Sequence, residues 1–264
     1  MKSLFAFASL FVILGANAQA STPVMKPFII GGTPVQSDSV IAHSTVALYM
    51  VSESALCTGS IISPNWIVTA AHCVTDENGQ AASPDDVSVF YGLDIMHPTT
   101  LSPNVQKVIV FPGYATQSND PTDEGDIALV QIEGNLPGGF TPIPILKNRS
   151  DLKAGETVTL AGYGMTDASS QSGVGLLREV SGIKILNPML GTTEVVLDQS
   201  EGHGACHGDS GGPGYLVDSS GNYHLWGITD RGYPDNAPDD CMHQAVYTNV
   251  LAYLDWIKQS VPGI

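Results

Sequence analysis

Two patterns of apolar residues divide the 264-residue chain. Between positions 4 and 15 the apolar run is almost unbroken, whereas from Ile29 onward short runs of Val, Ile, Thr and Tyr alternate with clusters of turn residues. Short apolar runs bounded by Gly, Pro, Asn, Asp and Ser are typical of strands in β-sandwiches and barrels. The sequence therefore predicts strands at Thr45–Met50, Trp66–Thr69, Val87–Tyr91, Ile127–Ile132, Val158–Ala161 and Tyr223–Thr229.

One segment near the C-terminus has helical spacing instead. Apolar residues recur at three- and four-residue intervals between Val250 and Ile257, which predicts a C-terminal helix. The segment Asp218–Asn222, between two strand-like runs, predicts a hairpin turn. The Leu136–Gly139 segment, with one proline and two glycines, is the best candidate for a boundary between two halves of similar size.

The N-terminal apolar run has the arrangement of a secretory signal peptide. Lys2 supplies a positive start, and the run from Leu4 to Gly15 is shorter than the ~20 residues that cross a bilayer. Small residues permit cleavage after Ala18 or Ala20, so we expect residues 1–20 to be a signal peptide. A buried N-terminal helix is the alternative. Export makes the protein extracellular, or periplasmic if its source is a Gram-negative bacterium.

The composition and net charge exclude some classes of binding partner. An apolar content of 43% is too high for a disordered chain, and 26 Asp and Glu against 10 Lys and Arg give a net charge of −16. Residues 1–28 hold two lysines and no acid, so the remainder would carry −18. Such a charge repels nucleic acid and anionic membranes. We expect an acidic globular protein, a monomer, with neither kind of partner.

Three short motifs carry candidate chemistry. The strongest is Gly208–Pro213, with the sequence Gly-Asp-Ser-Gly-Gly-Pro, because glycines beside a serine let a substrate carbonyl approach and let backbone amides turn inward. The second is Thr69–Cys73, in which His72 follows a strand-like run. The third is Asp126–Val130, an aspartate that opens an apolar strand. Each of the last two is weak alone, since core histidines and strand-initial aspartates are common.

In this order the motifs resemble the trypsin/chymotrypsin family of serine endopeptidases. The likeness extends over nearly all of residues 29–264 and includes Cys57–Ile62, Gly162–Gly164 and Val246–Thr248. It implies an all-β fold, a chymotrypsin-like double barrel of two six-stranded antiparallel β-barrels with a C-terminal α-helix. The first barrel would span about residues 29–138 and the second about 139–264, with the active site between them.

The resemblance implies a serine protease mechanism, with protein or peptide substrates and proteinaceous protease inhibitors as partners. His72 would act as general base and then general acid, and Asp126 would orient its imidazole. Ser210 would attack the scissile carbonyl, while the amides of Gly208 and Ser210 form the oxyanion hole. This chemistry requires no metal or cofactor. A catalytically inactive binding protein on the same fold is the alternative function.

The four cysteines fit the same resemblance. An exported protein uses cysteines as disulfides rather than as metal ligands. The family pattern implies one bridge beside the catalytic histidine and another that brackets the substrate pocket, and the alternative is a metal site built on two nearby histidines. The bridges would be Cys57–Cys73 and Cys206–Cys241, and the alternative metal site would use His203, Cys206 and His207.

The segment Ile29–Gly32 resembles the N-terminus that activation creates in this family. The freed α-amino group of Ile29 would pair with Asp209, because burying that carboxylate without a partner costs several kcal/mol. Residues 21–28 would then be an activation pro-segment, and the protein would be made as a zymogen. Many relatives carry Arg or Lys before the cut, whereas Phe28 stands here. Self-activation by an enzyme that accepts aromatic residues would explain this junction.

The residues expected around the substrate pocket predict which side chain is preferred before the cut. Gly204 lies where trypsin-like members hold the aspartate at the base of their pocket, and a pocket without that carboxylate cannot offset the desolvation of Arg or Lys. With Gly232 and Ala245 on the walls, we predict a neutral slot for large apolar residues before the cut. The alternative is a preference for acidic residues, which Arg231 would bind if it faced the pocket together with His203 or His243.

Two residues of the pocket wall depart from the family pattern. Asp230 and Arg231 stand where a serine and a tryptophan are usual. Asp230 would place a second carboxylate near Asp126, which is unfavourable unless Arg231 or a proton compensates. Alternatively the alignment is shifted, because the stretch from Gly232 to Asp240 is longer than usual.

Two further features are weaker. Asparagine 148 begins an Asn-Arg-Ser glycosylation sequon, which has meaning only in a eukaryotic secretory pathway. Acidic clusters precede Asp126 and follow His72, and some relatives bind calcium in the loop after the histidine. Neither cluster has EF-hand spacing, so solvated turns are the simpler interpretation and Ca²⁺ is the alternative. The clustered acids are Asp76, Glu77, Asp85, Asp86, Asp120, Asp123 and Glu124.

Overall fold

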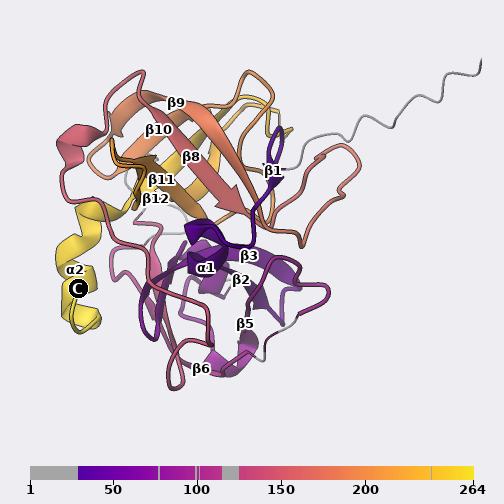
Figure 1. The fold of residues 1–264 in the computed structure, drawn as a ribbon, viewed down its shortest axis with the longest axis vertical. Coiled ribbons are helices and arrows are strands. Elements are labelled where there is room, and N and C mark those ends of the chain that lie inside the picture. The colour runs from indigo at the N-terminus through magenta and orange to yellow at the C-terminus, as the bar shows by residue number, and fades with distance from the viewer. Residues whose placement is uncertain (1–28, 77, 99, 101, 115–124, 239) are drawn as a thin grey trace, which may run out of the picture.

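A computed structural model describes residues 29–76, 78–98, 100, 102–114, 125–238 and 240–264. The signal peptide and pro-segment expected at residues 1–28, as well as Glu77, Asp120, Asp123 and Glu124, lie outside the described residues. Strands dominate the described part and form two sheets that lie one above the other in Figure 1. None of the helices in those ranges is both long and apolar enough to cross a membrane.

The first sheet holds six antiparallel strands in the order β5-β2-β3-β4-β7-β6. A short helix, α1 (Val40–Ser44), leads directly into it. The sheet curls, and the Ser102 hydroxyl donates to the Val89 carbonyl, which ties the entry of β6 to β5. The strands are β2 (Thr45–Met50), β3 (Ala55–Ser63), β4 (Trp66–Thr69), β5 (Val87–Phe90), β6 (Val105–Val110) and β7 (Ala128–Ile132).

The second sheet is a closed barrel. Its strand order is β1-β9-β10-β13-β12-β11-β8, and β8 pairs back with β9, so that six strands close and β1 adds an outer edge. Closure leaves the six strands without open edges. The strands are β1 (Thr33–Pro34), β8 (Thr157–Gly162), β9 (Arg178–Leu190), β10 (Glu194–Asp198), β11 (Pro213–Val217), β12 (Tyr223–Tyr233) and β13 (Gln244–Asn249).

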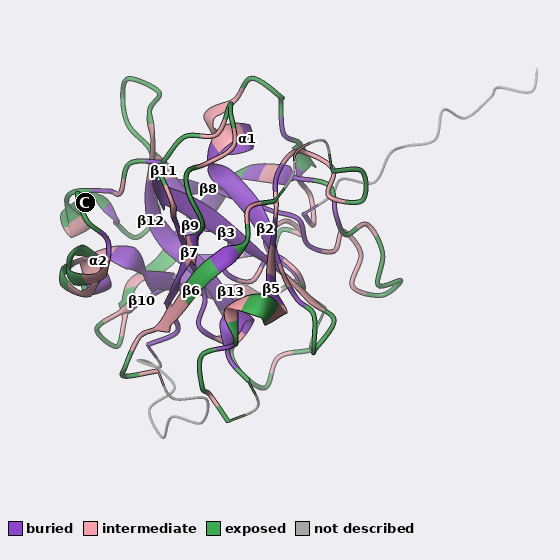
Figure 2. Ribbon diagram, turned by 90° about the horizontal axis from the view of Figure 1, so that it is seen from below, coloured by how far each residue is buried: buried purple, intermediate pink, exposed green. Residues whose placement is uncertain are grey.

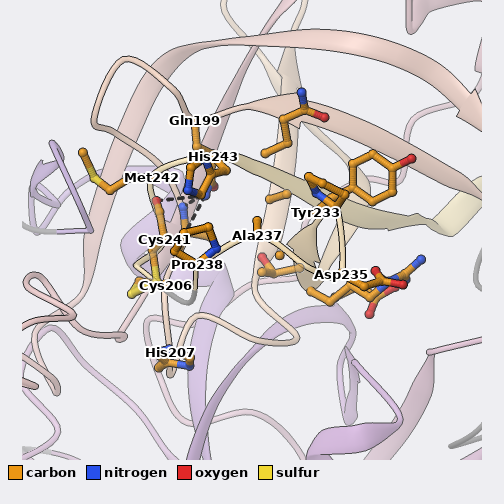
Figure 3. Close-up of a pocket in the computed structure, with 18 of the residues that line it drawn as sticks. Gln199, Cys206, His207, Tyr233, Asp235, Ala237, Pro238, Cys241, Met242 and His243 are labelled. Carbon is orange, nitrogen blue, oxygen red and sulfur yellow. Dashed lines mark hydrogen bonds and ion pairs between the residues drawn. A yellow bond between two sulfur atoms is a disulfide. The ribbon is translucent and has the colours of Figure 1, made fainter.

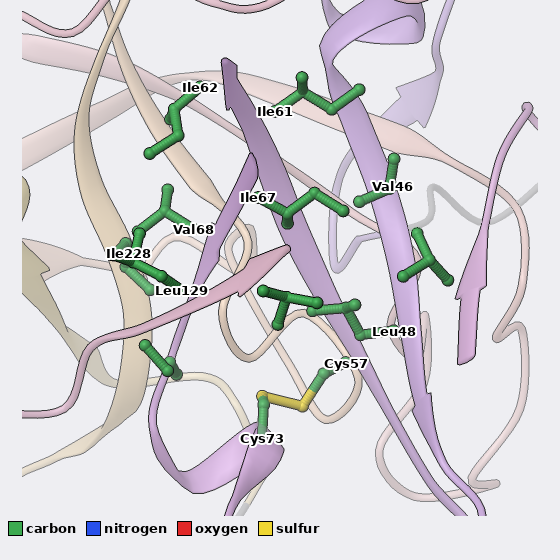
Figure 4. Close-up of a cluster of buried hydrophobic side chains, with 14 of the residues drawn as sticks. Val46, Leu48, Cys57, Ile61, Ile62, Ile67, Val68, Cys73, Leu129 and Ile228 are labelled. Atoms are coloured by element: carbon green, nitrogen blue, oxygen red, sulfur yellow. A yellow bond between two sulfur atoms is a disulfide. The ribbon is translucent and has the colours of Figure 1, made fainter. Parts of the chain in front are cut away.

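Together these sheets confirm the predicted all-β, chymotrypsin-like double barrel with its C-terminal α-helix. The closure differs between the two halves, because only the second is closed by strand pairing among the described residues, whereas β5 and β6 stand at the two ends of the first sheet's order. The apolar side chains are buried in two clusters, one that spans both halves and one in the second barrel, and most strands are accordingly purple in Figure 2. In the first, Val46, Leu48, Ile61 and Ile67 point inward beside a disulfide (Figure 4).

Several predicted elements form where the sequence placed them. The strands predicted at Thr45–Met50 and Trp66–Thr69 have those same bounds. The hairpin turn also forms, because the Asp218 carboxylate accepts the backbone N–H groups of Ser220 and Asn222. The C-terminal helix begins as a 3₁₀ turn, Val250–Tyr253, and continues as α2 (Leu254–Ser260). The sequence did not single out β9, whose thirteen residues include a glycine and a proline.

Candidate active site

His72 and Asp126 are brought together by two paired strands. His72 opens a 3₁₀ turn, His72–Val74, just after β4, and Asp126 lies just before β7; β4 and β7 pair with Thr69 opposite Ala128. The Asp126 carboxylate accepts the His72 backbone N–H at 2.8 Å and lies 2.6 Å from its Nδ1. Two contacts to one carboxylate fix the ring, which leaves Nε2 as the nitrogen able to exchange a proton with a substrate.

Asp126 is an anion held inside the protein. Its side chain is 2% exposed, against 35% for that of His72. Burial by itself favours the neutral carboxyl, but the charge of His72 and its hydrogen bonds outweigh burial and lower the pKa of Asp126. The carboxylate therefore stays ionised at neutral pH and can stabilise a proton on the imidazole.

Ser210 is attached to both halves of the molecule. Its carbonyl accepts the Thr58 N–H on β3 at 2.8 Å, and the next residue, Gly211, donates to Thr229 on β12 at 2.8 Å. Thr58 follows Cys57, which is bonded to the cysteine after His72. The loop of Ser210 and the turn of His72 are therefore both attached to β3, at the adjacent residues Thr58 and Cys57.

The loop around Ser210 has free amides and tight glycines. Gly208 has φ +92°, and a Cβ there would lie 2.9 Å from the Cα of Gly164, so no larger residue fits. Within the described residues, the N–H groups of Gly208 and Ser210 donate to no backbone carbonyl. Two adjacent N–H groups available beside a serine are the arrangement that an oxyanion needs.

Asp209 is anchored behind this loop. Its carboxylate accepts the Gly164 N–H at 2.8 Å and the Cys206 N–H at 2.9 Å. It is almost fully buried, and burial raises its pKa to about 7 despite those two bonds. Ile29 is buried in the core of the second barrel, and the adjoining Ile30 carbonyl accepts the Gly204 N–H at 2.8 Å. The predicted partners thus lie in the same barrel.

The raised pKa of Asp209 predicts how the uncleaved chain responds to pH. A carboxyl whose pKa rises from its ordinary 3.8 to about 7 on folding binds its proton more tightly in the native state, so stability falls as pH rises from about 4 to 7. Asp209→Asn removes this titration. We expect urea unfolding of uncleaved Asp209→Asn to show a flatter pH dependence than wild type. A variant that lost the same stability over this interval would contradict the assignment.

Both expected disulfides are present. Cys57 bonds Cys73 and Cys206 bonds Cys241. Because both sulfur atoms of each pair are used, Cys206 cannot act as a thiolate in the alternative metal site with His203 and His207.

The acidic turns considered for calcium do not bring side chains together around one point. In the part of the chain that the structure describes, some groups of three or more acidic, histidine or cysteine side chains are close enough to share an ion. Asp76, Asp85 and Asp86 belong to none of these groups. Asp76 instead accepts the backbone N–H groups of Asn78 and Gln80, and Asp86 accepts the backbone N–H and the hydroxyl of Ser52. The described acids therefore fit hydrogen-bonded turns better than a calcium site.

A cavity of about 360 Å³ opens beside Ser210 (Figure 3). Gly232, Ala245 and Arg231 line it, as the sequence predicted for the pocket, but Gly204 does not. Gln199, which the sequence did not reveal, takes that place: a Cβ on Gly204 would lie 2.2 Å from its side chain. The Gln199 amide accepts the Ala205 N–H at 2.6 Å and donates to the carbonyls of Ala205 and Cys241.

Arg231 lines the cavity, but its charge is already matched. Its two terminal nitrogens lie 3.1 and 2.9 Å from the two carboxylate oxygens of Glu194, and Nη1 lies 2.6 Å from Asp230. Of the histidines considered with it, His243 lines the cavity and His203 does not. A guanidinium bound to two buried carboxylates is a poor site for a third, from a substrate. This geometry weighs against an acidic preference.

Comparisons with known proteins agree with this geometry. The family model described as Trypsin matches residues 29–257. A CLIP domain-containing serine protease B4 from Anopheles gambiae is 30% identical over 237 residues, covering 78% of this chain and 62% of that protein. The suppressor of tumorigenicity 14 protein homolog from Bos taurus is 29% identical over 238 residues, covering 82% of this chain and 26% of its own length. The chain thus spans less than two thirds of either relative.

Proposed function

The chain belongs to the trypsin family, and from that premise we propose that it is a secreted serine endopeptidase acting through His72, Asp126 and Ser210. The observation that carries the proposal is the 2.6 Å contact between His72 Nδ1 and the buried, ionised Asp126, next to a serine loop with two available amides. His72 takes the hydroxyl proton as Ser210 attacks the carbonyl, and the amides of Gly208 and Ser210 bind the oxyanion. Water then hydrolyses the acyl-enzyme.

A fluorophosphonate probe tests the proposal without knowledge of the substrate. Such a probe modifies only a serine activated by a base, so we expect labelling of the protein cleaved before Ile29 and none of its Ser210→Ala variant. Ser220→Ala, in the exposed hairpin turn between β11 and β12, is the matched control and should label like wild type. A folded, cleaved protein that takes up no label would instead support the alternative of an inactive binding protein.

We further propose that the pocket accepts large apolar side chains before the cut. Its floor is the Gln199 amide, whose hydrogen bonds are made within the protein, so a charged substrate group placed there would lose water without gaining a partner. On a panel of peptide substrates we expect Phe, Tyr or Leu to exceed Arg, Lys and Glu by at least about 100-fold in kcat/KM. A preference for Arg or Glu would contradict the neutral pocket.

The same pocket suggests how the zymogen is activated. Cleavage after Phe28 would free the α-amino group of Ile29 for Asp209, whose buried carboxylate needs a cation at neutral pH. A pocket that accepts phenylalanine would let one molecule cleave another at this bond. We expect a Phe28→Ala proenzyme, followed by mass spectrometry, to remain uncleaved before Ile29 while wild type matures. Unchanged maturation of the variant would show that another protease makes the cut.

A further inference from the structure

Asp230 occupies an irregularity in β12 beside the candidate catalytic residues. Thr229 pairs with Tyr247 and Arg231 with Val246, so Asp230 is an extra residue inserted at a β-bulge. Bulges redirect a side chain, here into the protein, because the Asp230 side chain is only 4% exposed. One oxygen of Asp230, one oxygen of Asp126 and a ring nitrogen of His72 all lie within 4.8 Å of one another.

Arg231 and Glu194 hold Asp230 from the other side. Arg231 binds both oxygens of Glu194, which lies on β10, two strands away across β13, and its Nη1 also contacts Asp230 Oδ2 at 2.6 Å. Glu194 is buried, and the bidentate contact with this guanidinium stabilises its ionised form. The fourth carboxylate near Arg231, that of Asp235, is 63% exposed and 3.9 Å from Nε.

The charges of this cluster do not balance if every carboxyl is ionised. The buried carboxyl groups of Asp230 and Glu194 both contact the Arg231 guanidinium, and that of Asp126 contacts His72. The bidentate contact assigns that guanidinium to Glu194 first. Two ionised carboxylates as close as Asp126 and Asp230, shielded from water, repel each other strongly, and such pairs keep one proton between them.

We propose that Asp126 and Asp230 share one proton and that Asp230 is a positioning residue, which donates this proton to the Asp126 carboxylate in an O–H···O hydrogen bond. Asp230 then fixes the Asp126 oxygens toward His72, while its Oδ2 accepts from Arg231. The pair carries a single negative charge, which the imidazolium formed during catalysis would match. The proposal rests on the proposed function only for its catalytic consequence, because the shared proton exists with or without turnover.

The surroundings support this protonation. The charged or titratable groups next to the pair are His72 from the turn after β4 and Arg231 from β12. Arg231 is in turn contacted by Glu194 from β10 and by Asp235 from the loop after β12. A side-chain hydrogen bond from Asp230 is among the causes that hold the pKa of Asp126 low, after burial, which opposes them, and the interactions with His72. Such a bond between two carboxyl groups requires a proton on one of them.

Infrared spectroscopy detects that proton without any measurement of activity. The sample is the cleaved protein in the Ser210→Ala background at pH 8, where exposed carboxyl groups are ionised, compared with the same protein carrying Asp230→Asn. We expect the difference spectrum to contain the carbonyl stretch of one protonated carboxyl group, lost in the variant. A difference spectrum with only carboxylate bands would overturn the shared proton, even if the protein is an active protease.

A variant series then tests the positioning role. We expect Asp230→Ala to lower kcat about 10- to 100-fold, and Asp230→Ser to restore most of the loss, because a hydroxyl can still donate to Asp126. The apparent pKa of the acid limb of kcat/KM should be the same in wild type and Asp230→Ser. Asp255→Ala, on the exposed face of α2, is the control for removing an acid elsewhere.

Two results would overturn the role. Asp230→Ser no more active than Asp230→Ala would show that donation is irrelevant. An acid limb shifted to lower pH in both variants would show that wild-type Asp230 is ionised and acts by its charge. If Asp230→Ala does not fold, the comparison of Asp230→Ser with wild type and the infrared measurement still decide between these outcomes.

Discussion

Ser210→Ala is expected to lower kcat about 10⁶-fold, the size of the loss when a triad nucleophile is removed in a comparable serine protease. The attacking oxygen disappears, so no acyl-enzyme forms, and His72 has no proton to accept. What remains is the stabilisation by the Gly208 and Ser210 amides, which the backbone retains. The measurement is single-turnover and steady-state hydrolysis of a peptide substrate with an apolar residue before the cut.

The loss should be purely catalytic. The loop is held by backbone bonds from Thr58 and to Thr229, which the substitution leaves in place. We expect the unfolding free energy of Ser210→Ala to differ from wild type by less than about 0.5 kcal/mol, and Ser220→Ala to match wild type in both assays. A Ser210→Ala protein with more than about 1% of wild-type kcat would refute the assignment of the nucleophile.

Asp126→Asn is expected to lower kcat about 10⁴-fold at neutral pH, as the same exchange does in a related triad. The amide has no charge to stabilise the imidazolium, and its NH₂ group favours the wrong tautomer of His72. The wild-type stability gained from this carboxylate is present above its ordinary pKa of 3.8 and is lost as pH falls, because its folded pKa is lowered. Asp126→Asn should therefore lower stability near pH 7 and lose less on acidification.

The carboxyl group of Asp230, close to Asp126 and His72, provides a further test of this assignment. If Asp230 could replace Asp126 as the partner of His72, the Asp126→Asn variant would keep more than about a tenth of wild-type kcat. That result would contradict the assignment of Asp126, rather than Asp230, as the carboxylate that orients His72. Asp255→Asn, which removes an exposed acid from α2, provides the control for both kinetics and thermal unfolding. The contact of 2.6 Å between Asp126 and His72 Nδ1 makes Asp126 the expected partner.

Much of the fold was predictable because many strands have a local sequence pattern that can be recognised without the structure. Runs such as Thr45–Met50 and Trp66–Thr69 are apolar, short and bounded by turn residues, and they have the same bounds in the structure. The long β9 was not predictable in this way, since a strand that bends around a closed barrel tolerates a glycine and a proline. Its pairing with β1, β8 and β10 depends on chain segments far apart in sequence.

The base of the pocket was likewise not predictable from local sequence. Gly204 was expected to form this base, because the resemblance to the trypsin/chymotrypsin family implies that the residue six positions before Ser210 lies there. The structure turns that segment so that the side chain of Gln199 fills the space beside Gly204. No local pattern around Gln199 indicates this, because its partners Ala205 and Cys241 lie 6 and 42 residues further along the chain and meet it only in the folded loops.

The sequence alone determined the chemistry of the candidate site: a serine among glycines, a histidine after a strand, an aspartate before another, and an acidic surplus that disfavours nucleic acid and membranes. The resemblance to the trypsin/chymotrypsin family, which rests on the order of these motifs, is what assigns them to one site. The tertiary structure alone decided where Arg231 points. Arg231 could have bound an acidic substrate side chain, but Glu194 on β10, beyond β13, forms an ion pair with it instead. Charge balance in a buried cluster depends on which groups meet in space.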